Sequence, residues 1–100
     1  MAAYWLARAT IIDPTKYRRY NEAARAAWPK YPRRVLARGG RYEVLEGDVA
    51  ETRFVVQEFG SFELGLRYFH SPEYQAAAAF RRDGGSFSEL VLAEGVNGGG

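Results

Sequence analysis

Ionisable side chains within apolar stretches are the first candidates for chemistry in this 100-residue chain. Glu58 lies in the segment Val55-Val56-Gln57-Glu58-Phe59, which has the composition of a strand. A carboxylate among apolar neighbours is costly unless it is paired, and such surroundings favour its use as a general base. Glu58 is therefore a candidate catalytic base. An ion pair with an arginine of the same sheet is the structural alternative.

Three arginines also fall on predicted strands, namely Arg8, Arg38 and Arg53. A guanidinium group can hold a carboxylate through two parallel hydrogen bonds, so each of them is a candidate ligand-binding residue. Each could equally pair with Glu58 or Glu94, or extend to the solvent. The residues alone leave both interpretations open.

His70 is the only histidine and the second candidate for proton transfer. It falls at the expected end of a helix, where a histidine commonly caps the helix or is solvated. A catalytic role requires that it face a cleft. Because the chain has one histidine and no cysteine, a metal site of several imidazoles or of thiolates is excluded. We expect no metal and no cofactor.

Tyrosines and tryptophans are numerous for a chain of this length. Tyr17, Tyr20 and Trp28 recur at helical spacing, which favours packing in the core. A hydroxyl that faces a cavity would instead orient a ligand. Tyr20 and Tyr74 are the candidates for that role.

The charge pattern argues against nucleic acid as a partner. The net charge is only +2, and acidic residues closely follow the basic cluster of Lys30, Arg33, Arg34, Arg38 and Arg41. Proteins that track a phosphate backbone gather more cations on one face, so we expect this cluster to be a solvated edge. No apolar run approaches the ~20 residues of a membrane span, and the start lacks a signal-peptide pattern. We therefore expect a cytoplasmic protein without membrane contact.

The elements that position these residues follow the order β-α-β-β-α-β. Strands are expected over 4–12, 34–38, 52–59 and 87–94, with 42–45 extending the second strand. The first helix is expected to start at Asp13-Pro14 and to stop at the prolines that follow Trp28. The second helical region is expected over 62–82, broken near Ser71 by the cap signal Ser71-Pro72.

These elements predict a single ferredoxin-like α+β domain over residues 1–96. Its sheet is expected to be antiparallel, with both helical regions on one face. Asn97-Gly98-Gly99-Gly100 is expected to be a flexible glycine-rich tail over 97–100.

Two of the predicted strands are apolar on both faces. In the third strand Phe54 and Val56 alternate with Val55 and Phe59, and the last strand shows the same pattern. Two helical regions cover only one face, and each large side chain left on the other is worth roughly 1.5–3 kcal/mol when buried. A second copy packed sheet to sheet is the simplest cover, so we expect a homodimer. Partial shielding by long polar side chains is the alternative.

Several short motifs, in a fixed order along nearly the whole chain, resemble a known family. They are Asp13-Pro14, Leu36-Ala37-Arg38-Gly39-Gly40, Glu43-Val44-Leu45-Glu46-Gly47, Val55-Val56-Gln57-Glu58-Phe59, Ser71-Pro72-Glu73-Tyr74-Gln75 and Leu90-Val91-Leu92-Ala93-Glu94. The chain is similar to the domain of unknown function 1330 family, and the resemblance implies a dimeric α+β barrel. The wider superfamily includes cofactor-free monooxygenases, lactone isomerases, haem enzymes and sensing modules, so the fold does not select a function. His70 departs from the small polar or acidic residue that the family prefers before Ser-Pro-Glu-Tyr.

The leading interpretation is a small-molecule site between the sheet and the helices. Glu58 would be its base or anchor, an arginine its anion clamp and a tyrosine its hydrogen-bond donor. Such a site would serve binding alone, or the chemistry of a cofactor-independent monooxygenase or isomerase. A non-catalytic dimerisation or interaction module is the alternative, because no Ser-His-Asp, paired-carboxylate or phosphate-loop pattern is present.

Overall fold

The computed structural model describes residues 1–50 and 52–96. Its strands are β1 (Ala3–Ile11), β2 (Arg33–Arg38), β3 (Arg53–Phe59) and β4 (Ser86–Glu94). Its helices are α1 (Pro14–Ala26), α2 (Phe62–His70) and α3 (Pro72–Phe80), and a short 3-10 helix (Trp28–Lys30) follows α1. The tail expected at 97–100 lies outside the described residues.

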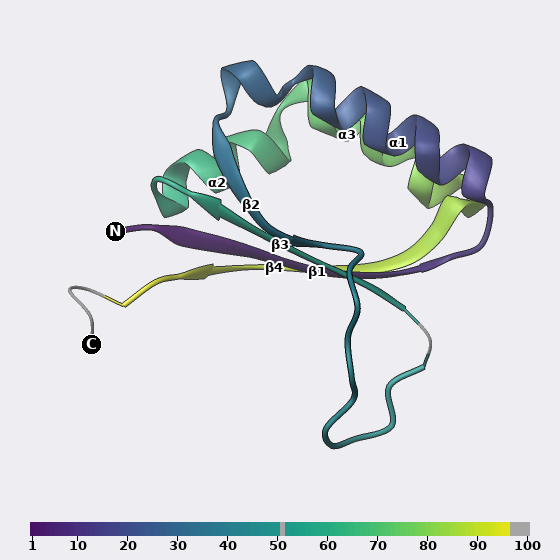
Figure 1. The fold of residues 1–100 in the computed structure, drawn as a ribbon. Coiled ribbons are helices and arrows are strands. Elements are labelled where there is room, and N and C mark those ends of the chain that lie inside the picture. The colour runs from purple at the N-terminus through teal and green to yellow at the C-terminus, as the bar shows by residue number, and fades with distance from the viewer. Residues whose placement is uncertain (51, 97–100) are drawn as a thin grey trace.

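The strands form one antiparallel sheet in the order β2-β3-β1-β4. All three helices lie on one side of it (Figure 1). We call the opposite side the uncovered face; it carries Leu6, Val56 and Val91, which are aligned across β1, β3 and β4. The α+β class and the ferredoxin-like order of elements are confirmed. None of the described helices is long and apolar enough to cross a membrane.

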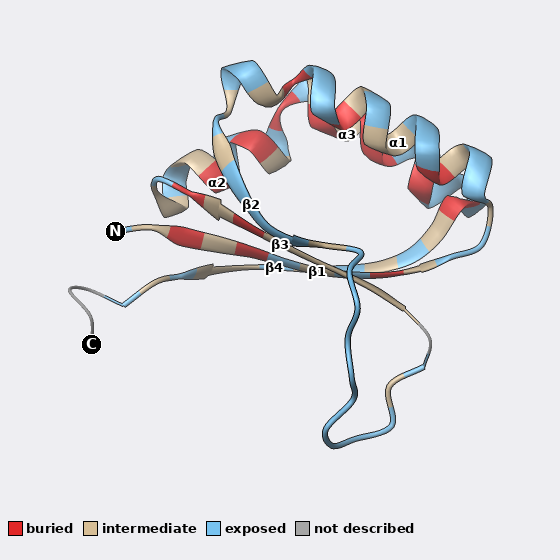
Figure 2. Cartoon of the chain, in the orientation of Figure 1, coloured by how far each residue is buried: buried red, intermediate tan, exposed pale blue. Residues whose placement is uncertain are grey.

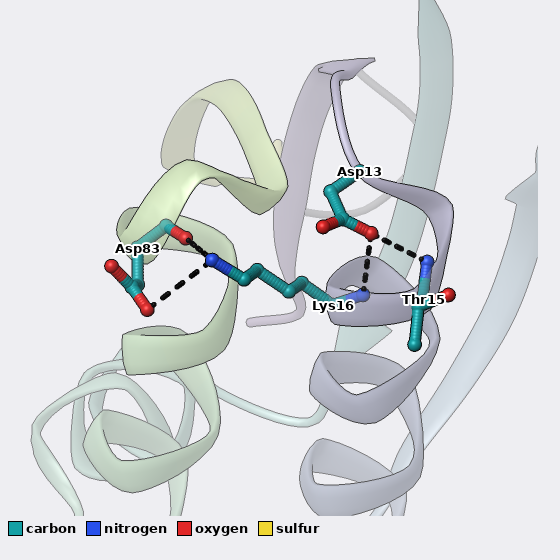
Figure 3. Close-up of polar contacts among 4 residues, drawn as sticks. All are labelled: Asp13, Thr15, Lys16 and Asp83. Carbon is teal, nitrogen blue, oxygen red and sulfur yellow. Dashed lines mark hydrogen bonds and ion pairs between the residues drawn. The ribbon is translucent and has the colours of Figure 1, made fainter.

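Helix α1 begins where the sequence predicts. The Asp13 side chain accepts hydrogen bonds from the backbone N–H groups of Thr15 at 3.0 Å and Lys16 at 3.2 Å (Figure 3). The Lys16 ammonium donates to the backbone carbonyl of Asp83 at 2.8 Å and pairs with the Asp83 carboxylate. Gly84 then turns the chain with a φ of 79°, a conformation that favours glycine. These contacts hold α1 against the turn that leads into β4.

One serine ends α2 and begins α3, as the sequence predicts. Ser71 is extended, and its hydroxyl donates to the carbonyl of Tyr68 at 2.7 Å and accepts from the N–H of Tyr74 at 3.1 Å. Pro72 takes the first position of α3, where its missing N–H costs nothing. Because Ser71 is only 4 % exposed, water has little access to the two backbone groups that it satisfies.

We expect Ser71→Ala to lower the free energy of unfolding by about 1–2 kcal/mol, because two buried backbone groups lose their partner. Chemical denaturation followed by circular dichroism measures the change. Ser61→Ala is the matched control, since Ser61 caps α2 from a half-buried position through one hydrogen bond, to the N–H of Leu64. A loss no larger than that of the control would show that water replaces the Ser71 hydroxyl.

The core between sheet and helices is mainly aromatic. Trp5 of β1 lies at its centre, with the ring centroids of Tyr74 at 5.3 Å, Tyr68 at 5.4 Å and Phe59 at 6.1 Å. None of these four side chains is more than 5 % exposed. Figure 2 shows the buried residues on the helix surfaces that face the sheet and along β1 and β3. Aromatic rings from two strands and two helices therefore hold the two layers together.

The expected extension of the second strand is wrong. β2 ends at Arg38, and residues 42–45 are not in a strand. Gly39 turns the chain away with a φ of 65°, which a residue with a side chain rarely adopts. Residues 39–50 instead project from the sheet on the side away from the helices (Figure 1).

The expectation of a solvated basic edge is wrong for Arg33. Its guanidinium carbon lies 3.9 Å from the ring centroid of Tyr68, 4.6 Å from that of Trp28 and 4.7 Å from that of Phe59. We call these three rings the aromatic box. The guanidinium also donates to two acceptors, the carbonyl of Tyr31 at 2.9 Å and the side-chain oxygen of Gln57 at 2.8 Å. Arg33 is therefore a half-buried part of the fold.

Candidate functional site

A cavity of about 40 Å³ lies between the sheet and helix α1. Its wall combines aromatic rings with polar side chains. The aromatic residues are Trp5, Tyr17, Tyr20, Trp28 and Tyr68. The polar residues are Arg8, Asn21, Arg25, Arg38, Arg53, Gln57, Arg81 and Ser88. Small-molecule sites combine aromatic and apolar side chains with placed polar groups, and the wall of this cavity has both kinds of residue.

Strand register brings two arginines to the cavity from the sheet. Arg38 is paired across the ladder with Val55, and Arg53 with Ala9. Val55 and Ala9 line the cavity themselves, so both arginines lie on the face that the helices cover. A Cβ atom added at Gly39 would lie 2.7 Å from the guanidinium carbon of Arg53. The glycine that ends β2 therefore also leaves room for this guanidinium.

Arg81, directly after α3, is a buried arginine in the same wall. It is 7 % exposed, and its Nη2 donates to the Tyr74 hydroxyl at 3.1 Å. The hydroxyls of Tyr74 and Tyr20 are 3.0 Å apart, which extends the hydrogen-bonded chain to α1. The Nε–H groups of Arg81 and Arg53 are buried without a hydrogen-bond partner among the described residues. A buried donor of this kind is costly unless an acceptor satisfies it.

The tyrosines of the wall are held in the neutral form. Burial raises the pKa of Tyr20, and the nearby Tyr74 hydroxyl adds to this effect. Burial also raises the pKa of Tyr17, although the charges of Arg53 and Arg81 oppose the shift. Near pH 7 both hydroxyls therefore keep their proton. The site thus supplies hydrogen-bond donors and positive charge.

The structure brings most of the predicted ligand-binding residues together. Three of them line the cavity: Tyr20, Arg38 and Arg53. Tyr74 is joined to them through its hydrogen bond to Tyr20. Arg8 borders the cavity as well, but it alternates with Ala7 and Ala9, so its side chain lies on the uncovered face, where its Nε donates to the carboxylate of Glu89 at 2.6 Å in an exposed ion pair. Contact of these residues with a ligand stays a prediction.

The structure corrects the position that we expected for Glu58. Its side chain lies on the uncovered face, because Glu58 alternates with Gln57 and Phe59, which are buried under the helices. There its carboxylate accepts a hydrogen bond from the Tyr4 hydroxyl at 3.2 Å and pairs with Arg34 at 3.0 Å. Glu58 is absent from the described wall of the cavity, so a ligand held there does not contact it.

His70 is exposed at the end of α2, with its ring edge-on to that of Phe69 at 5.1 Å. It borders a separate apolar hollow over β4, which also includes Leu66 and Val91. His70 is likewise absent from the described wall of the cavity. The two predicted catalytic residues therefore lie apart from the predicted ligand-binding residues.

Sequence reasoning missed Tyr17 and Arg81 as site residues. Arg81 follows Tyr74 by seven positions, which is about two helical turns, so it continues the inward face of α3. Tyr17 precedes Tyr20 by three positions, and the two ring centroids are 5.5 Å apart on the inner side of α1. In both cases the helical spacing relative to a predicted site tyrosine is the signal that would have found them.

Residues 2–96 match the family described as a domain of unknown function, DUF1330. The chain belongs to this family. The resemblance carried by the sequence motifs is therefore confirmed over nearly the whole chain. A comparison with curated proteins gives no match.

Solved structures share the fold of this DUF1330 domain. A protein of unknown function from Rhodopseudomonas palustris has a TM-score of 0.77 and 14 % identity, over 97 % of this chain and 84 % of that one. SnoaB, a cofactor-independent oxygenase from Streptomyces nogalater, has a TM-score of 0.65 and 15 % identity, over 97 % of this chain and 95 % of that one. A dimeric protein of unknown function with a ferredoxin-like fold from Bacteroides fragilis has a TM-score of 0.61 and 15 % identity, over 94 % of this chain and 96 % of that one. At such identity the likeness shows the fold alone.

Proposed function

We propose that this DUF1330 domain binds a small molecule in the cavity between its sheet and α1. The observation that carries the proposal is the pair of buried N–H groups of Arg53 and Arg81, which have no partner among the described residues. Buried polar groups in proteins nearly always have a partner, and an acceptor atom on a bound molecule would supply it. The rings of Trp5 and Trp28 in the same wall offer flat apolar surface to the rest of such a molecule.

Binding fits these side chains better than acid–base catalysis does. The described residues that line the cavity include no aspartate, glutamate or histidine. Burial raises the pKa of Tyr17 and of Tyr20, so neither hydroxyl releases its proton readily near pH 7. Chemistry of the oxygenase or isomerase kind would therefore have to take its proton acceptor from the substrate.

The size of the cavity favours a compact ligand. Its volume of about 40 Å³ exceeds the roughly 10–15 Å³ that a single water molecule needs. Sites for larger molecules reach roughly 300–1,000 Å³. We therefore expect entry of a ligand to displace Arg38, whose long side chain is half-buried at the end of β2.

We also infer that two copies pack through the uncovered face. Leu6, Phe87 and Val91 on this face are 41 %, 76 % and 60 % exposed. No described helix or strand covers them, and burial of such side chains is worth roughly 1.5–3 kcal/mol each. The dimeric relative from Bacteroides fragilis has the same fold, which supports this inference. The cavity wall comes from one chain, so the proposed binding does not need the partner.

Calorimetric titration of the full chain with benzoate, benzamide and benzyl alcohol tests the proposed site. We expect saturable binding of at least one of these compact compounds. Ala7→Leu should abolish it, because Ala7 lines the cavity and a leucine there occupies the space. Ala76→Leu is the control, since Ala76 is exposed on α3 and absent from the described wall. If none of the three binds, or if Ala7→Leu binds as well as the unaltered protein, the proposed function is wrong.

A further inference from the structure

The wall of the cavity is strongly positive. Its cationic side chains are Arg25, Arg38, Arg53 and Arg81. No acidic side chain belongs to the part of the wall that the structure describes. None of these four forms an ion pair with another described residue. Like charges in a partly buried wall repel one another, and an anion between them removes that cost.

We infer that the ligand of this site is a small organic carboxylate with a flat apolar body. The inference rests on the proposed function, since it names the class of molecule that the same cavity takes. Guanidinium groups match carboxylate oxygens in both charge and geometry. An amide or alcohol of the same shape offers an oxygen acceptor but no charge.

Arg53 and Arg81 are the residues that hold the carboxylate. The guanidinium carbon of Arg53 is 5.9 Å from the ring centroid of Tyr17, and that of Arg81 is 5.4 Å from the ring centroid of Tyr20. These two rings are neighbours, with centroids 5.5 Å apart. Each of the two cations therefore lies beside one ring of the same tyrosine pair, and each keeps a buried Nε–H for an acceptor.

The remaining wall selects the body of the ligand. The indole rings of Trp5 on β1 and Trp28 after α1 line the cavity together with the aliphatic side chains of Val55 on β3 and Leu90 on β4. Such surfaces favour a planar apolar group over a hydrated ion. A carboxylate attached to an aromatic ring satisfies both parts of the wall.

Calorimetric titration with benzoate, benzamide and inorganic phosphate separates charge from shape. We expect benzoate to bind at least about 10-fold more tightly than benzamide, because hydrogen bonds to an ionised acceptor are roughly twice as strong as neutral ones. Arg81→Met and Arg53→Met should each weaken benzoate by about 10- to 100-fold and benzamide by a smaller factor, about 3- to 10-fold, because the amide loses an uncharged hydrogen bond. Arg18→Met is the matched control, since Arg18 is exposed on α1 and should leave all affinities unchanged.

The outcomes distinguish this inference from the proposed function. Benzamide bound as tightly as benzoate would overturn the carboxylate and leave the proposed binding function intact. Phosphate bound as tightly as benzoate would show that the site does not require a flat apolar body on its ligand. If Arg81→Met fails to fold, the inference is still tested by the benzoate affinity of Arg53→Met. The ratio of the benzoate and benzamide affinities of the unaltered protein tests it as well. Failure of benzoate, benzamide and benzyl alcohol alike would instead reject the proposed function itself.

Discussion

Arg33→Met is expected to lower the free energy of unfolding by about 3 kcal/mol, from lost cation–π contacts and lost charge-assisted hydrogen bonds. The guanidinium lies within 5 Å of all three ring centroids of the aromatic box and also binds the carbonyl of Tyr31. Methionine keeps much of the volume but removes the charge and every donor. Urea denaturation measures the loss: the midpoint should fall, while the dependence of the free energy of unfolding on urea concentration stays unchanged.

The neighbouring Arg34 provides the matched control. Its side chain is 71 % exposed and pairs with Glu58 at 3.0 Å. An exposed ion pair contributes at most about 1 kcal/mol, so Arg34→Met should cost far less than Arg33→Met. Equal losses would mean that the aromatic box contributes no more than a surface ion pair. The same pair of variants also tests whether adjacent residues of one basic cluster have different roles.

Leu6→Asp combined with Val91→Asp is expected to separate the proposed dimer into single subunits. The two residues are cross-strand partners on the uncovered face, so their substitution places two carboxylates side by side in each copy. A two-fold axis doubles the effect, and the dissociation constant should rise by at least about 1,000-fold. Sedimentation at several protein concentrations measures the change in mass.

Ala76→Asp is the control for the dimer, because Ala76 is exposed on α3, on the opposite side of the molecule from the uncovered face. Its mass should match that of the unaltered protein. If the unaltered protein sediments as a single subunit at high concentration, the inferred dimer is wrong. Benzoate binding by the separated Leu6→Asp/Val91→Asp subunit should persist, since the described wall of the cavity comes from one chain.

The order of elements was predictable because its signals are local. Asp13 caps α1 through N–H groups two and three residues away, and Ser71 joins α2 to α3 through its own neighbours. Such hydrogen bonds form within one turn, so the residue types alone indicate them. The two-sided apolar character of β3 and β4 was equally visible, since alternation along a strand needs no partner.

The placement of Glu58 shows where this local reasoning ends. Its alternation with Phe59 already places the two side chains on opposite faces. Which face receives the helices depends on how α1 and α3 pack, and they pack over Phe59 and Trp5. A carboxylate among apolar neighbours therefore became a residue of the uncovered face, paired with Arg34.

The residue types were enough to predict the helices and the four principal strands, their order, the family and the candidate tyrosines and arginines. Which arginines are buried followed from the packing alone, because burial depends on groups that are distant along the chain. Arg33 meets Phe59 and Tyr68, and Arg81 lies in one cavity wall with Arg53. A guanidinium is stable away from water only where rings or acceptors replace its hydration, and packing alone brings those groups to it.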